Sequence, residues 1–104
     1  MFKLQLDQKE AYQQLNIGFI SGQNASNQDL VPWVDGYLSQ LIEDAPMRGS
    51  LLKINGDCSL QLAFVIARKV RHLYSAIAVF DSDLTKYVVV DSHSPNYCLG
   101  QLID

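Results

Sequence analysis

The sequence lacks a long apolar run and any excess of positive charge. A membrane-spanning helix needs about 20 consecutive apolar residues, and the first residues, MFKLQLD, lack the apolar core of a signal peptide. Eight Lys and Arg residues stand against eleven Asp and Glu residues, a formal net charge of −3, whereas a protein that coats DNA or RNA needs a broad basic face. We therefore expect a soluble, cytoplasmic protein that binds no membrane and no DNA, and a small anionic ligand stays possible.

Cysteine is also scarce. Cys58 and Cys98 stand alone, without a CxxC motif or a histidine at zinc-ligand spacing, so we expect reduced thiols and neither a structural zinc site nor a catalytic cysteine.

What the sequence does contain is 48% apolar and 18% charged residues, a composition typical of a folded chain. Its 104 residues suffice for one hydrophobic core, which predicts a single domain over residues 1–104.

The apolar pattern predicts four strands and two helices. Apolar residues at three- and four-residue spacing indicate helices, and shorter apolar runs indicate strands. The expected strands are residues 11–20, 50–55, 76–80 and 87–90, and the expected helices are residues 28–43 and 60–72. The order β-α-β-α-β-β, with a final hairpin, predicts an α/β fold in which two helices pack on a mixed sheet. The unbroken apolar runs of the last two strands predict that both of their faces are covered.

The second helix is expected to be amphipathic. Asp57 or Ser59 can cap its start, and its polar face would carry Gln61, Arg68 and His72. Its apolar face would consist of Leu60, Ala63, Phe64, Ala67 and Val70.

Topology sorts the polar residues onto two edges of the predicted sheet. Right-handed crossovers would make the first three strands parallel, so their carboxyl ends meet at one edge, where ligands of open α/β sheets bind. This top edge would gather Gly18, Ser21, Gly22, Asn24, residues 56–59, Asp81 and Asp83. The last strand runs back, so the bottom edge would gather Arg68, Lys69, Arg71, His72 and residues 91–94, which include His93.

These two edges are expected to lie far apart within one chain. A strand of about six residues is ~20 Å long, so Asp81 at the top edge and the two histidines at the bottom edge cannot touch the same atom. If they cooperate, they do so across two chains or two layers. Each feature also has an ordinary structural interpretation: cations suit the end of a helix, Asp81 suits a turn, and residues 56–59 suit a helix cap.

Six segments of the chain also carry a resemblance to a known family. They are LKING at 52–56, AFVIA at 63–67, HLY at 72–74, residues 76–81, residues 86–93 and GQLID at 100–104. In this order and spacing they resemble the small manganese-dependent, Csx-type ring nucleases of type III CRISPR systems. The resemblance runs from residue 12 to residue 104. It implies a Rossmann-like domain of the CARF kind, and a homodimer that stacks into a tetramer around cyclic tetra-adenylate.

The resemblance also implies an activity and roles for particular residues. Such enzymes cut the ring to linear oligoadenylates and thereby switch off type III CRISPR signalling. His72, Asp81 and His93 would be catalytic, with Asp81 and His93 as ligands of Mn²⁺, because imidazole and carboxylate suit both proton transfer and this metal. The expected ligand-binding residues are Ser21, Gly22, Asn24, Gly56, Arg68 and Arg71. The two arginines would neutralise phosphates.

Two positions depart from the pattern of that family. Asp83 stands where the family usually has a cation, and Asp57 follows Gly56 where the family has proline. Both departures add negative charge at the top edge, which disfavours phosphate binding. Two alternatives therefore stay open: a non-catalytic sensor or sponge for the same ligand, and a plain dimerisation domain.

Overall fold

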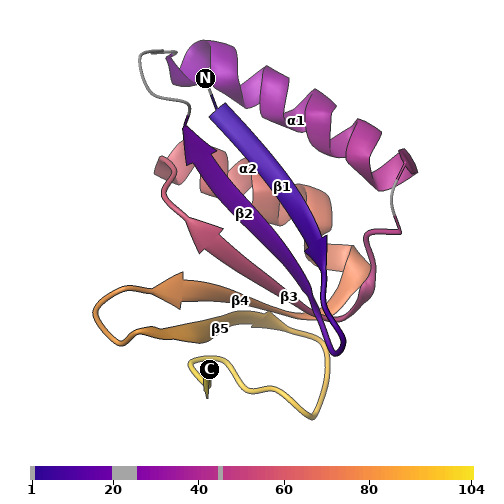
Figure 1. Cartoon of the computed structure of the whole chain (residues 1–104), viewed down its shortest axis with the longest axis vertical. Coiled ribbons are helices and arrows are strands. Elements are labelled where there is room, and N and C mark those ends of the chain that lie inside the picture. Colours follow the sequence, from indigo (N-terminus) through magenta and orange to yellow (C-terminus); the bar gives the residue numbers. More distant parts are fainter. Residues whose placement is uncertain (1, 20–25, 45) are drawn as a thin grey trace.

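A computed structural model describes residues 2–19, 26–44 and 46–104 of the chain. In these ranges a six-stranded sheet packs against two α-helices (Figure 1). The elements are β1 (Phe2–Gln8), β2 (Gln13–Phe19), α1 (Asn27–Asp44), β3 (Gly49–Gly56), α2 (Leu60–Val70), the 3₁₀ turn η1 (Arg71–Leu73), β4 (Tyr74–Asp81), β5 (Lys86–Ser92) and β6 (Leu102–Ile103). The predicted α/β class is confirmed. No helix in the described ranges is long and apolar enough to cross a membrane.

The strand order along the sheet follows the chain, from β1 to β6. Strands β2, β3 and β4 are parallel, and β5 runs antiparallel to β4. The predicted parallel trio and the final hairpin are therefore confirmed. The two edges defined above also exist, because the carboxyl ends of β2, β3 and β4 lie at the end of the sheet opposite to the carboxyl end of β5.

The expected order β-α-β-α-β-β was wrong at both ends of the chain, because β1 and β6 were not predicted. Strand β1 pairs with β2 over seven residues, from Phe2↔Phe19 to Gln8↔Gln13. Its Leu4 is buried whereas Lys3 and Gln5 are exposed, which is the alternation of a strand with one covered face. Strand β6 has only two residues, too few to leave a periodic pattern.

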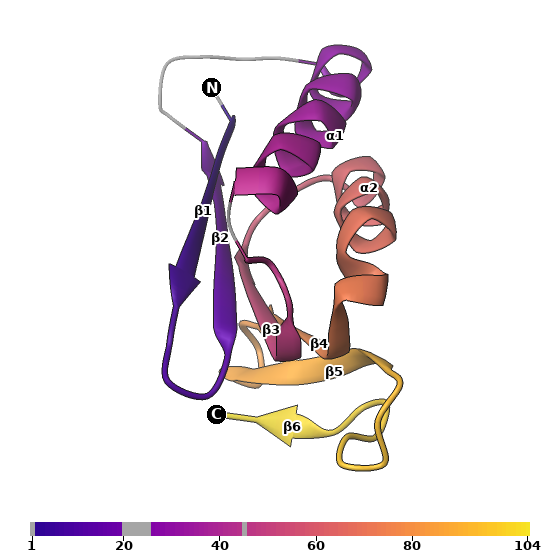
Figure 2. The same ribbon diagram turned by 90° about the vertical axis from the view of Figure 1, so that its right-hand side faces the viewer.

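Both helices lie on the same side of the sheet (Figure 2). The main core fills the space between them and the sheet, and it includes Leu15 and Leu52 from strands, Val34 and Leu38 from α1, and Leu62 from α2, all with an exposed fraction of 0%. A smaller cluster of Leu51, Ala76, Ala78 and Val89 forms the other face, covered in part by Tyr97 and Ile103 of the C-terminal segment.

The C-terminal segment is tied to the sheet by a buried lysine. The Nζ atom of Lys53 in β3 donates to the backbone oxygen of Asp104 at 2.6 Å. The same ammonium lies 4.0 Å from the ring centroid of Tyr12 and 5.1 Å from that of Tyr87, so two aromatic faces stabilise its charge away from water.

The face of α2 that packs into the core differs from the predicted one. The buried residues are Leu62, Ile66 and Val70, whereas Leu60 and Phe64 keep 72% and 69% of their surface exposed. At about 100° per residue, α2 carries two apolar stripes roughly a third of a turn apart. The stripe of Leu62, Ile66 and Val70 packs into the main core, and on the side toward α1, Arg68 and Lys69 each approach Asp35 at 3.2 Å.

Coverage of both faces is confirmed for β4 but not for β5. Strand β4 buries Ala76, Ile77 and Ala78 in succession. Strand β5 buries only Val89, and Val90 on the helix side remains 54% exposed. Figure 2 shows the physical reason: α1 and α2 lie over the strands that come before β5 in the sheet, so β5 lacks a helix above it.

Candidate functional site

The two histidines of the chain line one hollow at the bottom edge. This histidine hollow, of about 440 Å³, is formed by Gly49, His72, Leu73, Tyr74, Ser75 and His93. His72 comes from η1, which turns the chain from α2 into β4. His93 follows β5 and is held in place by its backbone N–H, which donates to the oxygen of Ser75 at 2.7 Å. The predicted meeting of the histidines at this edge is confirmed.

A carboxylate links His93 to a cation. Both oxygens of Asp91 accept from Nε of Arg71 at 3.3 Å, and its Oδ2 lies 3.2 Å from Nε2 of His93. The Asp91 side chain is only 22% exposed, whereas those of Arg71 and His93 are 63% and 44% exposed. Asp91 therefore orients one imidazole and one guanidinium at the surface, as second-sphere carboxylates do in proton-transfer and metal sites.

The turn after β5 presents His93 to the hollow. The Ser92 hydroxyl donates toward the carbonyl oxygens of Ser94 at 3.0 Å and Tyr97 at 2.8 Å, and it accepts from the N–H of Ser94 at 3.2 Å. These local bonds replace the strand ladder at the point where β5 ends. They fix the backbone on both sides of His93.

Tyr74 forms a wall of the hollow. Burial raises the pKa of its phenol, and its hydroxyl donates to Oε1 of Gln13. A phenol held neutral and bonded in this way exchanges no protons near neutral pH. The groups of the described hollow that suit acid–base chemistry are thus the imidazoles of His72 and His93.

Asp81 lies at the top edge, where it organises the β4–β5 turn. Its Oδ1 accepts from the backbone N–H groups of Asp83 at 2.9 Å and Leu84 at 3.1 Å. This is the Asx geometry that places aspartate at the start of turns. The structural interpretation of Asp81 as a turn residue is therefore confirmed. A further role of its carboxylate in chemistry is a separate question.

Gly56 has a structural reason to be glycine. Its φ is +124°, and a Cβ atom on it would lie 2.0 Å from the carbonyl oxygen of Ile17 in β2. The helix that follows is capped by Ser59, whose side chain accepts from the N–H of Leu62 at 3.2 Å. Of the two predicted caps, Ser59 is the one used.

The predicted site residues therefore divide into separate groups. Arg71, His72 and His93 come together at the bottom edge, and Asp81 and Gly56 lie at the top edge. Arg68 contacts Asp35 of α1 at 3.2 Å, along the seam between the helices. The residues predicted in the loop after the first strand lie outside the described part of the chain; they are Ser21, Gly22 and Asn24.

A metal held by Asp81 and His93 does not fit within one chain. Ala76 pairs with Ser92 at one end of the hairpin, and Asp81 pairs with Lys86 at the other. Five residue steps along a strand correspond to roughly 17 Å, far beyond the ~2 Å reach of metal ligands. Within the described residues, no three or more His, Cys, Asp or Glu side chains are grouped as metal ligands would be.

The sequence interpretation missed the role of Asp91. It placed residues 91–94 at the bottom edge without assigning this carboxylate a partner. The signal was present, because residues two apart on an extended strand share a face, and Asp91 precedes His93 by two. Arg71 could not be identified as the second partner without the register of β5 against β4 and the rotation of α2.

A comparison with protein families identifies the chain. A model of the family described as "CRISPR-associated protein (Cas_csx3)" matches residues 38–104, which is more than half of the chain. The chain belongs to the CRISPR-associated Cas_csx3 family. The matched part contains Arg71, His72, Asp81, Asp91 and His93 and thus both edges of the site. No individual curated protein matches the chain. The predicted membership of a CRISPR-associated Csx family is confirmed.

Proposed function

We propose that this Cas_csx3 protein is a ring nuclease, a phosphodiesterase that cuts cyclic tetra-adenylate to linear oligoadenylates and ends type III CRISPR signalling. The observation that supports it best is the division of the site: two imidazoles and a guanidinium share the bottom edge, while Asp81 lies at the top edge of the same chain. A cyclic ligand clamped between copies of the chain would bring opposite edges together. The proposed assembly is a homodimer that stacks into a tetramer around the ring.

The residues of the histidine hollow would supply proton transfer and charge. His72 is exposed on η1 and would act as general acid or base on the scissile phosphodiester, a role for which imidazole needs no special environment. Arg71 would bind a phosphate oxygen, since a guanidinium forms charge-assisted bonds with phosphate. Asp91 would compete with that phosphate for Arg71 and would keep His93 oriented.

The proposed cofactor is Mn²⁺, with Asp81 from one copy of the chain and His93 from another as ligands. A divalent ion there would stabilise negative charge on the scissile phosphate. Oxygen and nitrogen donors of this kind suit manganese. Because Asp81 and His93 lie far apart within one chain, this metal site requires the assembly. A chain that does not assemble could not hold Mn²⁺ with both residues.

The decisive assay is incubation with cyclic tetra-adenylate, with and without Mn²⁺, with products separated by chromatography. We expect linear oligoadenylates when Mn²⁺ is present, and at least ~100-fold less product from His72→Ala and from Asp81→Ala. Glu43→Ala, which removes an exposed carboxylate of α1, is the matched control and should cleave at the wild-type rate. An intact ring after long incubation at high wild-type concentration would refute the proposal.

Mixing the two inactive variants tests whether the site is shared. If His72 and Asp81 act from different chains, a mixture of His72→Ala and Asp81→Ala contains assemblies with one complete site and regains part of the activity. A mixture as inactive as its components would contradict the composite site while leaving cleavage itself in place.

A binder without catalysis is the second candidate. Asp83 stands beside Asp81 in the β4–β5 turn, and its negative charge opposes the build-up of negative charge on a scissile phosphate there, which would leave binding without cleavage. Calorimetry that detects heat of binding together with an intact ring would favour a sensor or sponge. The absence of any heat would remove that candidate.

A further inference from the structure

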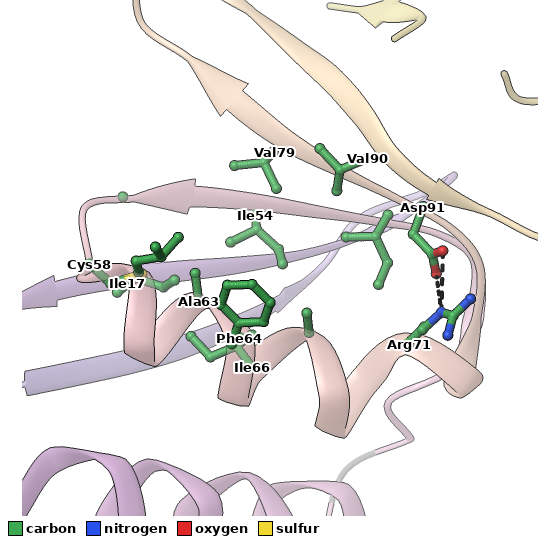
Figure 3. A pocket seen from close by; sticks show the side chains of 14 residues that line it. Ile17, Ile54, Cys58, Ala63, Phe64, Ile66, Arg71, Val79, Val90 and Asp91 are labelled. Atoms are coloured by element: carbon green, nitrogen blue, oxygen red, sulfur yellow. Dashed lines mark hydrogen bonds and ion pairs between the residues drawn. The ribbon is translucent and has the colours of Figure 1, made fainter. Parts of the chain in front are cut away.

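The face of the sheet opposite the helices carries a row of amide and aromatic side chains close to the top edge. On the helix side, three apolar side chains of neighbouring strands line a groove between α2 and the sheet (Figure 3): Ile17, Ile54 and Val79. Successive side chains of a strand point to opposite faces, so the residue beside each of these three points away from the helices. Together with the β5 partner of Phe80 they form what we call the open-face row: Asn16, Asn55, Phe80 and Tyr87.

The strand register sets the members of the open-face row side by side. Asn16 of β2 pairs with Asn55 of β3, and Phe80 of β4 pairs with Tyr87 of β5. The pairing of β3 with β4 ends one residue before Asn55 and Phe80. The same register continued by one residue puts these two beside each other, at about the 4.8 Å spacing of neighbouring strands. Asn55 therefore stands between an amide and an aromatic ring.

Asn55 is the member of this row whose polar atoms are left for a ligand. The Asn16 amide donates to Oδ2 of Asp7 at 2.9 Å and accepts from Gln14 at 3.1 Å. The Tyr87 hydroxyl accepts from the same Gln14 nitrogen at 3.1 Å. Asn55 is half-buried, and within residues 2–19, 26–44 and 46–104 its side chain makes no hydrogen bond. Because buried amides in proteins are almost always bonded, a half-buried free amide is suited to a polar ligand.

The chemistry around Asn55 suits a neutral base. The four residues of the open-face row carry no charge, and the carboxylate of Asp7 on the same face is already bonded by Gln5 and Asn16. A side-chain amide offers a donor and an acceptor in one plane. Adenine presents the complement at its N6 amino group and N7, whereas guanine presents two acceptors on that edge. An amide at this place therefore selects adenine.

An aromatic surface for the base stands next to this amide. Phe80 is partly exposed, and its ring packs edge-on against Tyr87, with the ring centroids 5.3 Å apart and 68° between the ring planes. Tyr87 is itself held through its hydroxyl. The Phe80 ring is thus fixed from one side, as in stacking platforms for bases on open sheets.

We propose that Asn55 reads an adenine of the cyclic ligand through hydrogen bonds to N6 and N7, and that the base stacks on Phe80. The open-face row is continuous with the candidate site, because Asp81 follows Phe80 directly. A neutral base is also not repelled by the acidic top edge as a phosphate is. For the identity of the ligand, the role of Asn55 rests on the proposed function.

The test compares two rings that differ only in the base, by calorimetry without Mn²⁺, so that binding is read apart from cleavage. The probes are cyclic tetra-adenylate and cyclic tetra-inosinate, in which a carbonyl oxygen replaces the amino donor of each base. We expect the wild type to bind cyclic tetra-adenylate at least ~10-fold more tightly, and Asn55→Ala to bind the two rings within about twofold of each other. Phe80→Leu should weaken the binding of both rings by roughly tenfold and keep the preference.

Two further variants separate the loss of the amide from a loss of folding. Asn55→Val, whose side chain suits a strand, should lose the preference in the same way as Asn55→Ala. Gln40→Ala removes an exposed amide from α1, on the other side of the sheet. It is the matched control and should keep both affinities.

Two results would overturn the role of Asn55: a wild type that binds both rings equally well, or a folded Asn55→Ala variant that keeps the full preference. Either result together with cleavage of cyclic tetra-adenylate by the wild type would leave the proposed function standing. An Asn55-dependent preference for a ring that stays intact would support the reading of the base and refute the nuclease. A wild type that binds neither ring would overturn both.

Discussion

Replacement of Gly56 by alanine should destabilise the protein strongly. Gly56 ends β3 beside Ile17 of β2, at the last pair of their parallel ladder. Its φ of +124° is one that residues with a Cβ rarely adopt, and the added Cβ would lie 2.0 Å from the Ile17 oxygen. Gly56 was also expected to bind ligand, so the experiment separates a structural role from a binding role.

The magnitude follows from two contributions. A positive φ costs a residue with a Cβ about 1–2 kcal/mol. Relief of the contact requires β2 and β3 to separate by roughly 1 Å at this point, which weakens a ladder hydrogen bond worth about 1 kcal/mol. Together they lower the free energy of unfolding by about 2–3 kcal/mol, which for a domain of this size corresponds to a fall in Tm of roughly 10–20 °C.

Thermal unfolding followed by circular dichroism measures this loss. Gly18→Ala is the matched control, because Gly18 lies near the same edge in β2 and its added Cβ would meet nothing within 4 Å; its unfolding free energy should change by less than about 0.5 kcal/mol. If Gly56→Ala unfolded within 3 °C of the wild type, the close approach of β2 and β3 would be refuted. If it unfolds early yet binds cyclic tetra-adenylate normally below its Tm, the role of Gly56 is structural alone.

Two further predictions concern the chemistry of single side chains. Asp91→Asn should reduce ring cleavage about tenfold, because His93 loses its charged partner. The free energy of unfolding in urea should change by less than about 1 kcal/mol, since the partners Arg71 and His93 keep 63% and 44% of their side chains exposed to water. An unchanged cleavage rate would remove Asp91 from the site. Burial raises the pKa of the Cys58 thiol, and the negative charge of Asp57 raises it further. At pH 8 iodoacetamide should therefore alkylate Cys58 at least ~10-fold more slowly than the exposed Cys98. Raising the pH should accelerate the reaction at Cys58. Equal rates in peptide mass mapping would contradict this.

The central part of the fold could be predicted because its signals are local. Apolar spacing identified α1, α2 and the strands β2 to β5, and the right-handed crossover rule then ordered the parallel strands. The choice of the buried face of α2 could not be predicted in the same way. Both stripes of the helix are apolar, and the choice between them depends on packing against α1 and the sheet, which the spacing within α2 does not report.

The candidate site could be predicted only to the level of an edge. Strand direction sufficed to bring His72 and His93 together and to separate them from Asp81, because these are properties of the topology. Strand direction alone could not predict which partner each of these side chains contacts. Arg71 meets Asp91 and Arg68 meets Asp35, and these choices depend on the rotation of α2 and on the register of β5.

A register shift in the β4–β5 hairpin places Asp91 beside the histidine hollow. Ile77 pairs with Asp91 and the next residue, Ala78, pairs with Val89, so Val90 is the extra residue of a β-bulge. In a regular strand Val90 and Asp91 would point to opposite faces, yet both line the same apolar groove between α2 and the sheet, because a bulge re-aims the side chains beside it. The bulge therefore places the apolar side chain of Val90 directly beside the carboxylate that holds His93. Without it, Asp91 would face away from Arg71, and neither the ion pair nor the orientation of His93 would form.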